Sequence, residues 1–439
     1  EGNSAILLEQ LGEGIFQINV GNLAQDDKVE FKLTIATMLE QSSKFARYYL
    51  PTVITPKYGK NPHEDFSGLT NEFFVEYQFL ATINVDEELA NQKMASQLTL
   101  IEENIEGQYS VNGFLDRDFT LTFSLPYNLP AKALYAKQDN EFCGIASFPT
   151  QIELPEKPAN VQVVLDCSGS MSGRAIDQVK IGLTQLLNLF DEHDKVNLIK
   201  FGSDIEQVVD QWQLFEGKAK SQLRRSISSL KADMGGTELF FALSKAIENA
   251  KAVPNAEILL LTDGEVWGDE NKVESLVIQA IKAECRVSVI GLGSSVNESF
   301  LNTLASRTHG ELCLINPSEN TAAKVEFFLK LVKSAKGSQK VAVDFEPTWQ
   351  KLPKKCLNYG VSNAFYMAEE GSVKRATSEQ TYVEQSNRIE AHWQLLDGII
   401  GQAIKAIVAN QRLLTSDRAV QCSLAEKYQQ ISEFTSFIM

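Results

Sequence analysis

Five oxygen-bearing side chains in three separate segments have the types and the order of a divalent-metal site: Asp166, Ser168, Ser170, Thr237 and Asp263. The first three lie in VVLDCSGSM, the fourth in MGGTE and the last in LLLTDGE. Carboxylate and hydroxyl oxygens are hard ligands, which Mg²⁺ accepts in near-octahedral geometry while it keeps some of its waters. A lone D-x-S-x-S loop is a weak signal. The same loop followed by GGT and then by a strand-ending TDG is a specific one.

The elements around these motifs predict how they are brought together. Apolar runs that read as buried strands precede both aspartates, and from Asn160 onward short strands alternate with amphipathic helices. Such alternation is typical of a doubly wound, mostly parallel sheet. Further strands are expected at Val196–Phe201 and near Gln207–Trp212, and helices near Lys272–Ala283 and Ser299–Arg307. Ligands of such sheets bind beyond the carboxyl ends of the strands, so we expect both aspartates at one edge.

The segments on either side of this region have different patterns. Residues 1–155 contain β-branched and aromatic runs separated by turn residues, which predict an antiparallel sandwich. After Lys336 the sequence predicts a small β unit, with strands in VAVDFEPTW and around Phe365–Met367. Two helices are expected to follow it, at Arg388–Leu413 and Asp417–Ile431.

The whole chain resembles proteins that join a VIT (vault and inter-α-trypsin) domain to a von Willebrand factor A domain. The runs SAILLEQ, FQINVGNL, YYLPTVITPKYG and LDRDFTLTF carry the first likeness, and KADMGGTEL, LTDGEVWG and AEKYQQISEFTSFI extend the second. The resemblance is closest to the von Willebrand factor A domain-containing 5 group. It is more distant to the vault poly(ADP-ribose) polymerase, whose catalytic region has no counterpart here, and to the inter-α-trypsin inhibitor heavy chains.

This resemblance implies a multidomain α and β protein with four parts. They are a VIT-type β-sandwich at 1–135, a linking strand at 136–158, a von Willebrand factor A domain at 159–335, and a small β unit with C-terminal helices at 336–439. Family members have more strands before LLEQ and continue past the final TSF. We therefore expect a fragment truncated at both ends.

The resemblance also implies the roles of the site residues. The five oxygen ligands match the metal-ion-dependent adhesion site of von Willebrand factor A domains, which holds Mg²⁺ or Mn²⁺. The two serines are expected to coordinate directly, and the aspartates and Thr237 either directly or through water. An open coordination position would accept an Asp or Glu carboxylate of another protein. The partner-binding rim is expected at Gly169, Met171, Gly236, Glu238 and Glu265.

Composition restricts the partners and leaves a second reading open. A net charge of −16 over 439 residues argues against nucleic acid, whose binding needs a basic surface. No apolar stretch is long enough to span a bilayer. The sequence therefore predicts a non-enzymatic module that captures a protein carboxylate. The alternative is a scaffold of a larger assembly in which the metal only stabilises the loops.

A hydrolase is the remote alternative, and the residues argue against it. Ser168 lacks the G-x-S-x-G elbow, and the nearest histidine in sequence, His193, is expected at the opposite edge of the sheet, out of reach as a triad base. GLGSSV lacks the full dinucleotide-binding spacing. The six cysteines show no C-x-x-C pairing, and several lie in apolar runs typical of buried thiols. They favour a cytoplasmic location, whereas a signal peptide before residue 1 would imply secretion.

Two further predictions concern architecture and switching. The chain should enter the metal domain near Pro158 and leave it near Lys336 at neighbouring points. Phe142–Phe148 and Val341–Phe345 should then pair into one small sheet. The final helix, about Glu319–Lys333, carries an apolar stripe that must pack on the sheet. In related domains, direct coordination by the threonine accompanies a shift of this helix. A rigid site with one geometry is the alternative.

Overall fold

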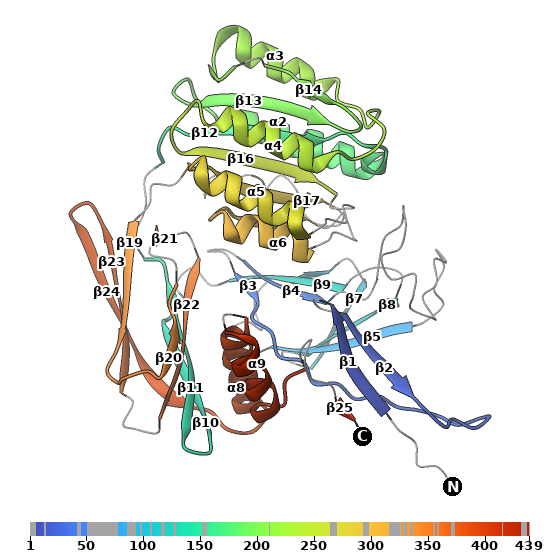
Figure 1. Cartoon of the computed structure of the whole chain (residues 1–439), viewed down its shortest axis with the longest axis vertical. Helices are drawn as coiled ribbons and strands as arrows, with labels where there is room; N and C mark the ends of the chain where they lie inside the picture. Colours follow the sequence, from blue (N-terminus) through green and yellow to red (C-terminus); the bar gives the residue numbers. More distant parts are fainter. Residues whose placement is uncertain are drawn as a thin grey trace. The chain divides into compact units, whose positions relative to one another are not determined.

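Figure 1 shows the fold of the whole chain in a computed structural model. It describes residues 6–12, 15–41, 45–50, 78–85, 94–96, 99–105, 108–115, 119–125, 129–151, 156–209, 211–263, 270–292, 298–315, 325, 328, 332–333, 337–353, 356–357, 360–369, 374–414, 416–431 and 437–438. The chain divides into two compact units. One comprises 1–46, 125–154 and 336–439, and the other comprises 47–124 and 155–335.

A mostly parallel sheet with strand order β14-β13-β12-β16-β17-β18 forms the centre of residues 155–335. Its parallel strands are β12 (Asn160–Asp166), β13 (Lys195–Phe201), β16 (Ala256–Thr262), β17 (Arg286–Leu292) and β18 (Leu312–Ile315). Two short strands, β14 (Ile205–Gln207) and β15 (Gln213–Leu214), pair antiparallel with β13. The doubly wound sheet predicted from the sequence is confirmed.

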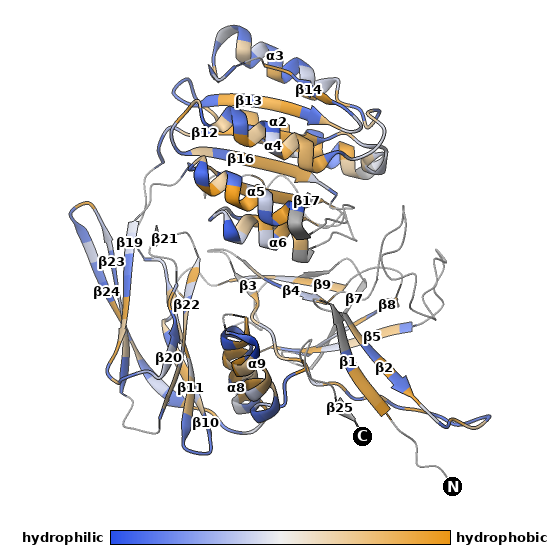
Figure 2. Ribbon diagram, viewed as in Figure 1, coloured by the Kyte–Doolittle hydropathy of each residue, from blue (hydrophilic) through white to orange (hydrophobic). Residues whose placement is uncertain are grey.

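Apolar strands buried on both faces need a helical layer on each side. The core on one face includes α2 (Arg174–Leu189) and α3 (Gly217–Ser228), together with Val325, Phe328 and Val332 of the predicted final helix. The core on the other face includes α4 (Leu239–Ala250), α5 (Glu270–Lys282) and α6 (Glu298–Arg307). Figure 2 shows the apolar residues running along β12, β13 and β16 between these layers. Ala322 and Leu329, which were expected in the final stripe, lie outside the described residues.

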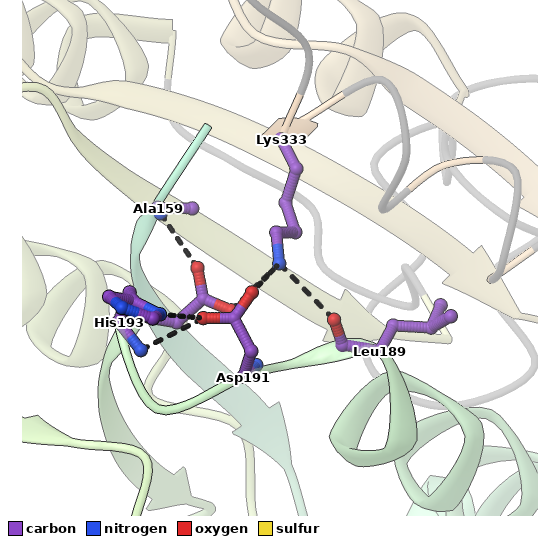
Figure 3. A network of polar contacts seen from close by, with 6 residues as sticks. Ala159, Leu189, Asp191, His193 and Lys333 are labelled. Atoms are coloured by element: carbon purple, nitrogen blue, oxygen red, sulfur yellow. Dashed lines mark hydrogen bonds and ion pairs between the residues drawn. The ribbon is translucent and has the colours of Figure 1, made fainter. Parts of the chain in front are cut away.

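The predicted closeness of the two ends of this domain is confirmed. The Lys157 N–H donates to the Lys333 carbonyl oxygen at 2.9 Å. The Lys333 ammonium group also contacts Asp194. Figure 3 shows its hydrogen bond to the Leu189 carbonyl oxygen. Chain entry, chain exit and the α2–β13 turn therefore meet at the amino-terminal edge of the sheet.

The other unit contains an eight-stranded sheet of order β20-β22-β11-β10-β24-β23-β19-β21. Its strands are β10 (Lys132–Gln138), β11 (Glu141–Pro149), β19 (Gly337–Val343), β20 (Trp349–Lys351), β21 (Cys356–Leu357), β22 (Val361–Glu369), β23 (Arg375–Tyr382) and β24 (Gln385–Leu395). Phe142 and Phe345 stack edge to face at 5.0 Å, and Phe148, Val343 and Phe345 share one core. The two segments flanking the insertion belong to one sheet, but the prediction that they pair with each other was wrong. β11 pairs with β10 and β22, whereas β19 pairs with β21 and β23.

Two boundaries differ from the prediction. The segment expected as a linking strand is the second half of a hairpin. In this hairpin β10 pairs antiparallel with β11, with Lys132 opposite Ser147 at one end and Gln138 opposite Glu141 at the other. The helix expected at Arg388–Leu413 begins only at Gly398, as α8 (Gly398–Leu413), because residues 385–395 form β24. The last helix, α9 (Arg418–Lys427), lies where it was predicted. Both helices pack on the face of the sheet that includes Cys143, Ile145 and Met367.

The N-terminal segments are β-rich, as expected, but the β-sandwich predicted for 1–135 stays a prediction, because the described strands fall into three small sheets. The remaining strands are β1 (Ile6–Gly12), β2 (Ile15–Val20), β3 (Glu40–Gln41), β4 (Phe45–Leu50), β5 (Gln78–Asn84), β6 (Met94–Ser96), β7 (Thr99–Ile105), β8 (Gln108–Phe114), β9 (Phe119–Ser124) and β25 (Phe437–Ile438). They form sheets of order β2-β1-β25, β3-β4-β9-β6 and β5-β8-β7. The third strand of the first sheet comes from the end of the chain, which the sequence did not predict.

Candidate metal centre

Strands β12 and β16 bring Asp166 and Asp263 to the same edge of the sheet. The two strands are parallel neighbours with Leu165 opposite Leu261. Asp166 is the last residue of β12, and Asp263 directly follows β16. Their exposed fractions are 0% and 7%, so both carboxyl groups are withdrawn from bulk water. The sequence prediction that these residues share the carboxyl edge is confirmed.

The Asp166 carboxylate is held at both of its oxygens. Its Oδ1 accepts hydrogen bonds from the Ser168 N–H at 3.0 Å and from the Ser168 hydroxyl at 2.6 Å. Its Oδ2 accepts from the Thr262 hydroxyl at 2.7 Å. The Oγ atoms of Ser168 and Ser170 are 3.0 Å apart. Three of the five predicted ligands therefore form one contiguous group of oxygen atoms, and Thr262 orients it.

Burial and the proximity of the two carboxylates shape the electrostatics of this group. Burial, followed by the negative charge of Asp263, raises the pKa of Asp166 to about 6, although the hydrogen bonds from Ser168 and Thr262 act in the opposite direction. Two buried acids that disfavour each other's ionisation are a typical arrangement where a cation balances the charge.

The loop that carries Thr237 lies along the D-x-S-x-S loop. The Gly169 N–H donates to the Gly235 carbonyl oxygen at 2.8 Å, and the Met234 N–H donates to the Cys167 carbonyl oxygen at 3.0 Å. Thr237 follows two residues after Gly235 and is half-buried. The backbone thus places the fourth predicted ligand beside the serine loop.

A third loop, which the sequence reasoning missed, supports the GGT segment from its other side. The Ser203 N–H donates to the Met234 carbonyl oxygen at 2.7 Å, and the Ser203 hydroxyl accepts from the Gly236 N–H at 2.7 Å. The Glu238 N–H donates to the Gly202 carbonyl oxygen at 2.8 Å. The signal in the sequence was a small-residue loop, FGSD, directly after a buried strand.

The five predicted rim residues have three different outcomes. Gly169, Gly236 and Glu238 are exposed next to the serine and GGT loops, as a rim requires. Met171 is fully buried and belongs to the core of the domain, so its place in the rim was wrong. Met171 lies in the 3₁₀ turn Gly169–Met171, and its side chain belongs to the core on the α2 face of the sheet. Glu265 lies outside the described residues.

The donor set fits a hard divalent cation. The group offers carboxylate and hydroxyl oxygens, the ligands that Mg²⁺ prefers, and no imidazole. The candidate centre has only two carboxylates, and its other donors are hydroxyl oxygens. Within the described ranges, His, Cys, Asp and Glu side chains form no group of three or more that could hold a metal ion. His193 hydrogen-bonds Asp191 at the amino-terminal edge, opposite this site, as predicted. In the part of the chain that the structure describes, no helix is long and apolar enough to cross a membrane.

Comparisons with known proteins agree with this fold. Residues 160–328 match the von Willebrand factor type A domain. A von Willebrand factor A domain-containing protein of Dictyostelium discoideum is 25% identical over 379 residues, which cover 80% of this chain and 41% of that protein. Human inter-alpha-trypsin inhibitor heavy chain H3 is 24% identical over 343 residues, with coverages of 71% and 36%. The chain thus spans about two fifths of the length of these relatives.

Two further matches differ in coverage. An uncharacterized protein of Synechocystis is 34% identical over 167 residues, covering 37% of this chain and 39% of that protein. A solved von Willebrand factor type A structure from Catenulispora acidiphila has 14% identity and a TM-score of 0.43, covering 68% of this chain and 86% of that one. Residues 160–328 are therefore a von Willebrand factor type A domain, and the chain is homologous to proteins that contain this domain, including the inter-alpha-trypsin inhibitor heavy chains.

Proposed function

We propose that this chain is a metal-dependent interaction module that binds a carboxylate of a partner protein. The observation that carries the proposal is the position of Ser168 Oγ, 2.6 Å from Asp166 Oδ1 and 3.0 Å from Ser170 Oγ at the carboxyl edge of the sheet. Asp263 enters the same edge from β16, and the backbone of the GGT loop is bonded to the serine loop. Von Willebrand factor A domains generally mediate protein–protein interaction, which supports this class of function.

The residues that would hold Mg²⁺ (or Mn²⁺) are Asp166, Ser168, Ser170, Thr237 and Asp263. Bound there, the ion would supply a Lewis-acidic position for an Asp or Glu oxygen of the partner. The protein's own part is to fix its donors. Asp166 is held by three hydrogen bonds, and the serine and GGT loops are tied to each other through their backbones. A preorganised donor set lowers the ordering cost of binding.

Metal occupancy is tested by thermal unfolding in Mg²⁺ and in EDTA, with Thr237→Val as the matched variant. Threonine and valine have the same shape, and Thr237 is only half-buried, so the variant should fold and lose one ligand. Mg²⁺ should raise the melting temperature of the parent and raise that of Thr237→Val less. An identical melting temperature of the parent in Mg²⁺ and EDTA would contradict an occupied site.

Partner capture separates this function from its alternative, a scaffold whose loops the metal merely stabilises. A captured protein should be released by EDTA, should not bind Thr237→Val, and should be displaced by a glutamate peptide but not by its glutamine counterpart. Stabilisation by Mg²⁺ without any such carboxylate-dependent capture would favour the scaffold.

A further inference from the structure

Exposed carboxylates border the candidate metal centre on the β13 side. Asp204, Asp233 and Glu238 are exposed, and the loops that carry them are bonded to each other. The Gly202 N–H donates to the Asp204 carbonyl oxygen at 3.0 Å, and the Gly202 carbonyl oxygen accepts from the Glu238 N–H. Within 202–204 and 231–238 the one basic residue is Lys231. We call Asp204, Asp233 and Glu238 the acidic rim.

An aromatic side chain stands next to this rim. Phe241 lies in the first turn of α4 and is 63% exposed. Its neighbour Phe240 instead packs edge to face on Phe300 at 6.1 Å and receives the Lys272 ammonium over its ring at 5.5 Å. Helical side chains lean toward the amino terminus of their helix, so we expect Phe241 to lie over the turn that begins at Glu238.

We propose that the segment which reaches the metal presents one carboxylate within a stretch that is otherwise basic and apolar. A Lys or Arg of this segment faces the acidic rim, and a bulky apolar side chain packs on Phe241. This inference rests on the proposed function and names the class of its partner.

Charge complementarity selects this segment over other carboxylate-bearing ones. Several acidic residues in a row would be repelled by the rim and by a chain of net charge −16. A single acidic residue flanked by lysine or arginine can still reach the metal, and its basic neighbours are attracted to the acidic rim. The Phe241 ring adds apolar area that leaves water only when a partner side chain covers it.

The test uses four labelled nine-residue peptides and fluorescence anisotropy in Mg²⁺. The first has a central glutamate flanked by leucines and lysines. The second replaces its lysines with glutamines, the third replaces its leucines with serines, and the fourth replaces the glutamate with glutamine. The first peptide should bind several-fold more tightly than the second, and this advantage should shrink as NaCl is raised, because salt screens exposed charges. The fourth should not bind.

Variants of the chain assign the two contacts. Phe241→Ser should weaken the first peptide roughly five- to tenfold, the loss expected for one apolar contact, and leave the third unchanged. Glu238→Gln should reduce the advantage of the lysine peptide. Ile181→Ser is the matched control, because Ile181 is similarly exposed (52%) on α2, which packs on the other face of the sheet.

The outcomes distinguish this inference from the proposed function. Equal affinity for the first two peptides, together with no loss in Phe241→Ser, would overturn the inference. So would failure of all four peptides to bind a chain that Mg²⁺ still stabilises. If Mg²⁺ does not stabilise the chain, or if EDTA leaves peptide binding unchanged, the proposed function fails and this inference fails with it.

Discussion

The ammonium nitrogen of Lys333 lies 2.8 Å from Oδ2 of Asp194, and both side chains are buried. Asp194 also accepts from the Ala159 N–H at 2.8 Å and from the Asp191 N–H at 2.8 Å. The same ammonium group donates to the Leu189 carbonyl oxygen at 3.2 Å, at the last residue of α2. One buried ion pair therefore joins the entry of the von Willebrand factor type A domain, its exit and the carboxyl end of α2.

Lys333→Met should destabilise the chain strongly. Removing one partner of a buried ion pair typically costs roughly 3–5 kcal/mol, because the other charge stays buried without its counterion. Asp191→Asn is the matched control. Asp191 is 3.3 Å from the same ammonium group, but its side chain is 56% exposed, so its loss should cost about 1 kcal/mol or less. Urea unfolding measures both, and equal costs for the two variants would contradict the central role of Asp194.

The same ion pair predicts an alkaline loss of stability. Burial disfavours the charged ammonium, but Asp194 and Asp191 outweigh that effect and raise the pKa of Lys333. A raised folded-state pKa means that the stabilisation is fully present below the unfolded-state pKa, about 10.4, and is lost as pH rises through the folded-state value. The difference in unfolding free energy between the parent and Lys333→Met should therefore shrink above about pH 10.5. Comparing the two proteins cancels other alkaline titrations, and a pH-independent difference would refute the assignment.

The sequence predicted the positions of the two aspartates better than the residues that support them. Asp166 and Asp263 end apolar runs whose length and pattern specify buried parallel strands, so their convergence followed from topology. Ser203 is a lone serine in a loop, and a single hydroxyl has no pattern that separates a loop support from a solvated side chain. Lys333 and Asp194 are 139 positions apart, and in the sequence each resembles an ordinary surface charge.

The missed boundaries have a similar physical origin. Residues 385–395 alternate between exposed and more buried side chains with the period of a strand. The apolar run GIIGQAIKAIVA begins soon after them, at Gly398, and the predicted helix was therefore started too early, at Arg388. The pairing of β25 with β1 depends on contacts across more than four hundred residues, which local periodicity does not encode.

Ser203→Ala should weaken Mg²⁺ binding without unfolding the domain. The Ser203 hydroxyl accepts the Gly236 N–H, and its loss frees the loop that presents Thr237. Residues that orient metal ligands typically contribute about 10- to 100-fold in metal affinity. Titration calorimetry with Mg²⁺ measures this loss. Ser172→Ala, at an exposed serine just after the 3₁₀ turn, is the control and should bind as the parent does. An unchanged affinity in Ser203→Ala would show that this loop does not position the site.

The final helix provides a test of switching. Lys333 is the last residue of the helix that was predicted to shift with metal coordination, and the ion pair with Asp194 holds that end. If the helix has two positions with different affinities, Lys333→Met should change the EDTA-sensitive affinity for the lysine–leucine peptide. A ligand or a mutation shifts such an equilibrium only if its interaction free energy differs between the two helix positions. Peptide affinity equal to that of the parent, measured where both proteins are folded, would indicate a static site.

Two glycines in the loops at the carboxyl edge of the sheet, Gly202 and Gly169, should respond differently to substitution by alanine. A Cβ at Gly202 would lie 2.3 Å from the Met234 carbonyl oxygen, far inside contact distance, and that oxygen is fixed by the Ser203 N–H. A Cβ at Gly169 would meet the Gly235 carbonyl oxygen at 3.7 Å, an ordinary contact. Gly202→Ala should therefore push the GGT loop away, lower the melting temperature and remove stabilisation by Mg²⁺, whereas Gly169→Ala should fold as the parent does. Thermal unfolding of both variants in Mg²⁺ and EDTA decides the matter, and a Gly202→Ala protein that Mg²⁺ stabilises as fully as the parent would show that this packing is not needed to position Thr237.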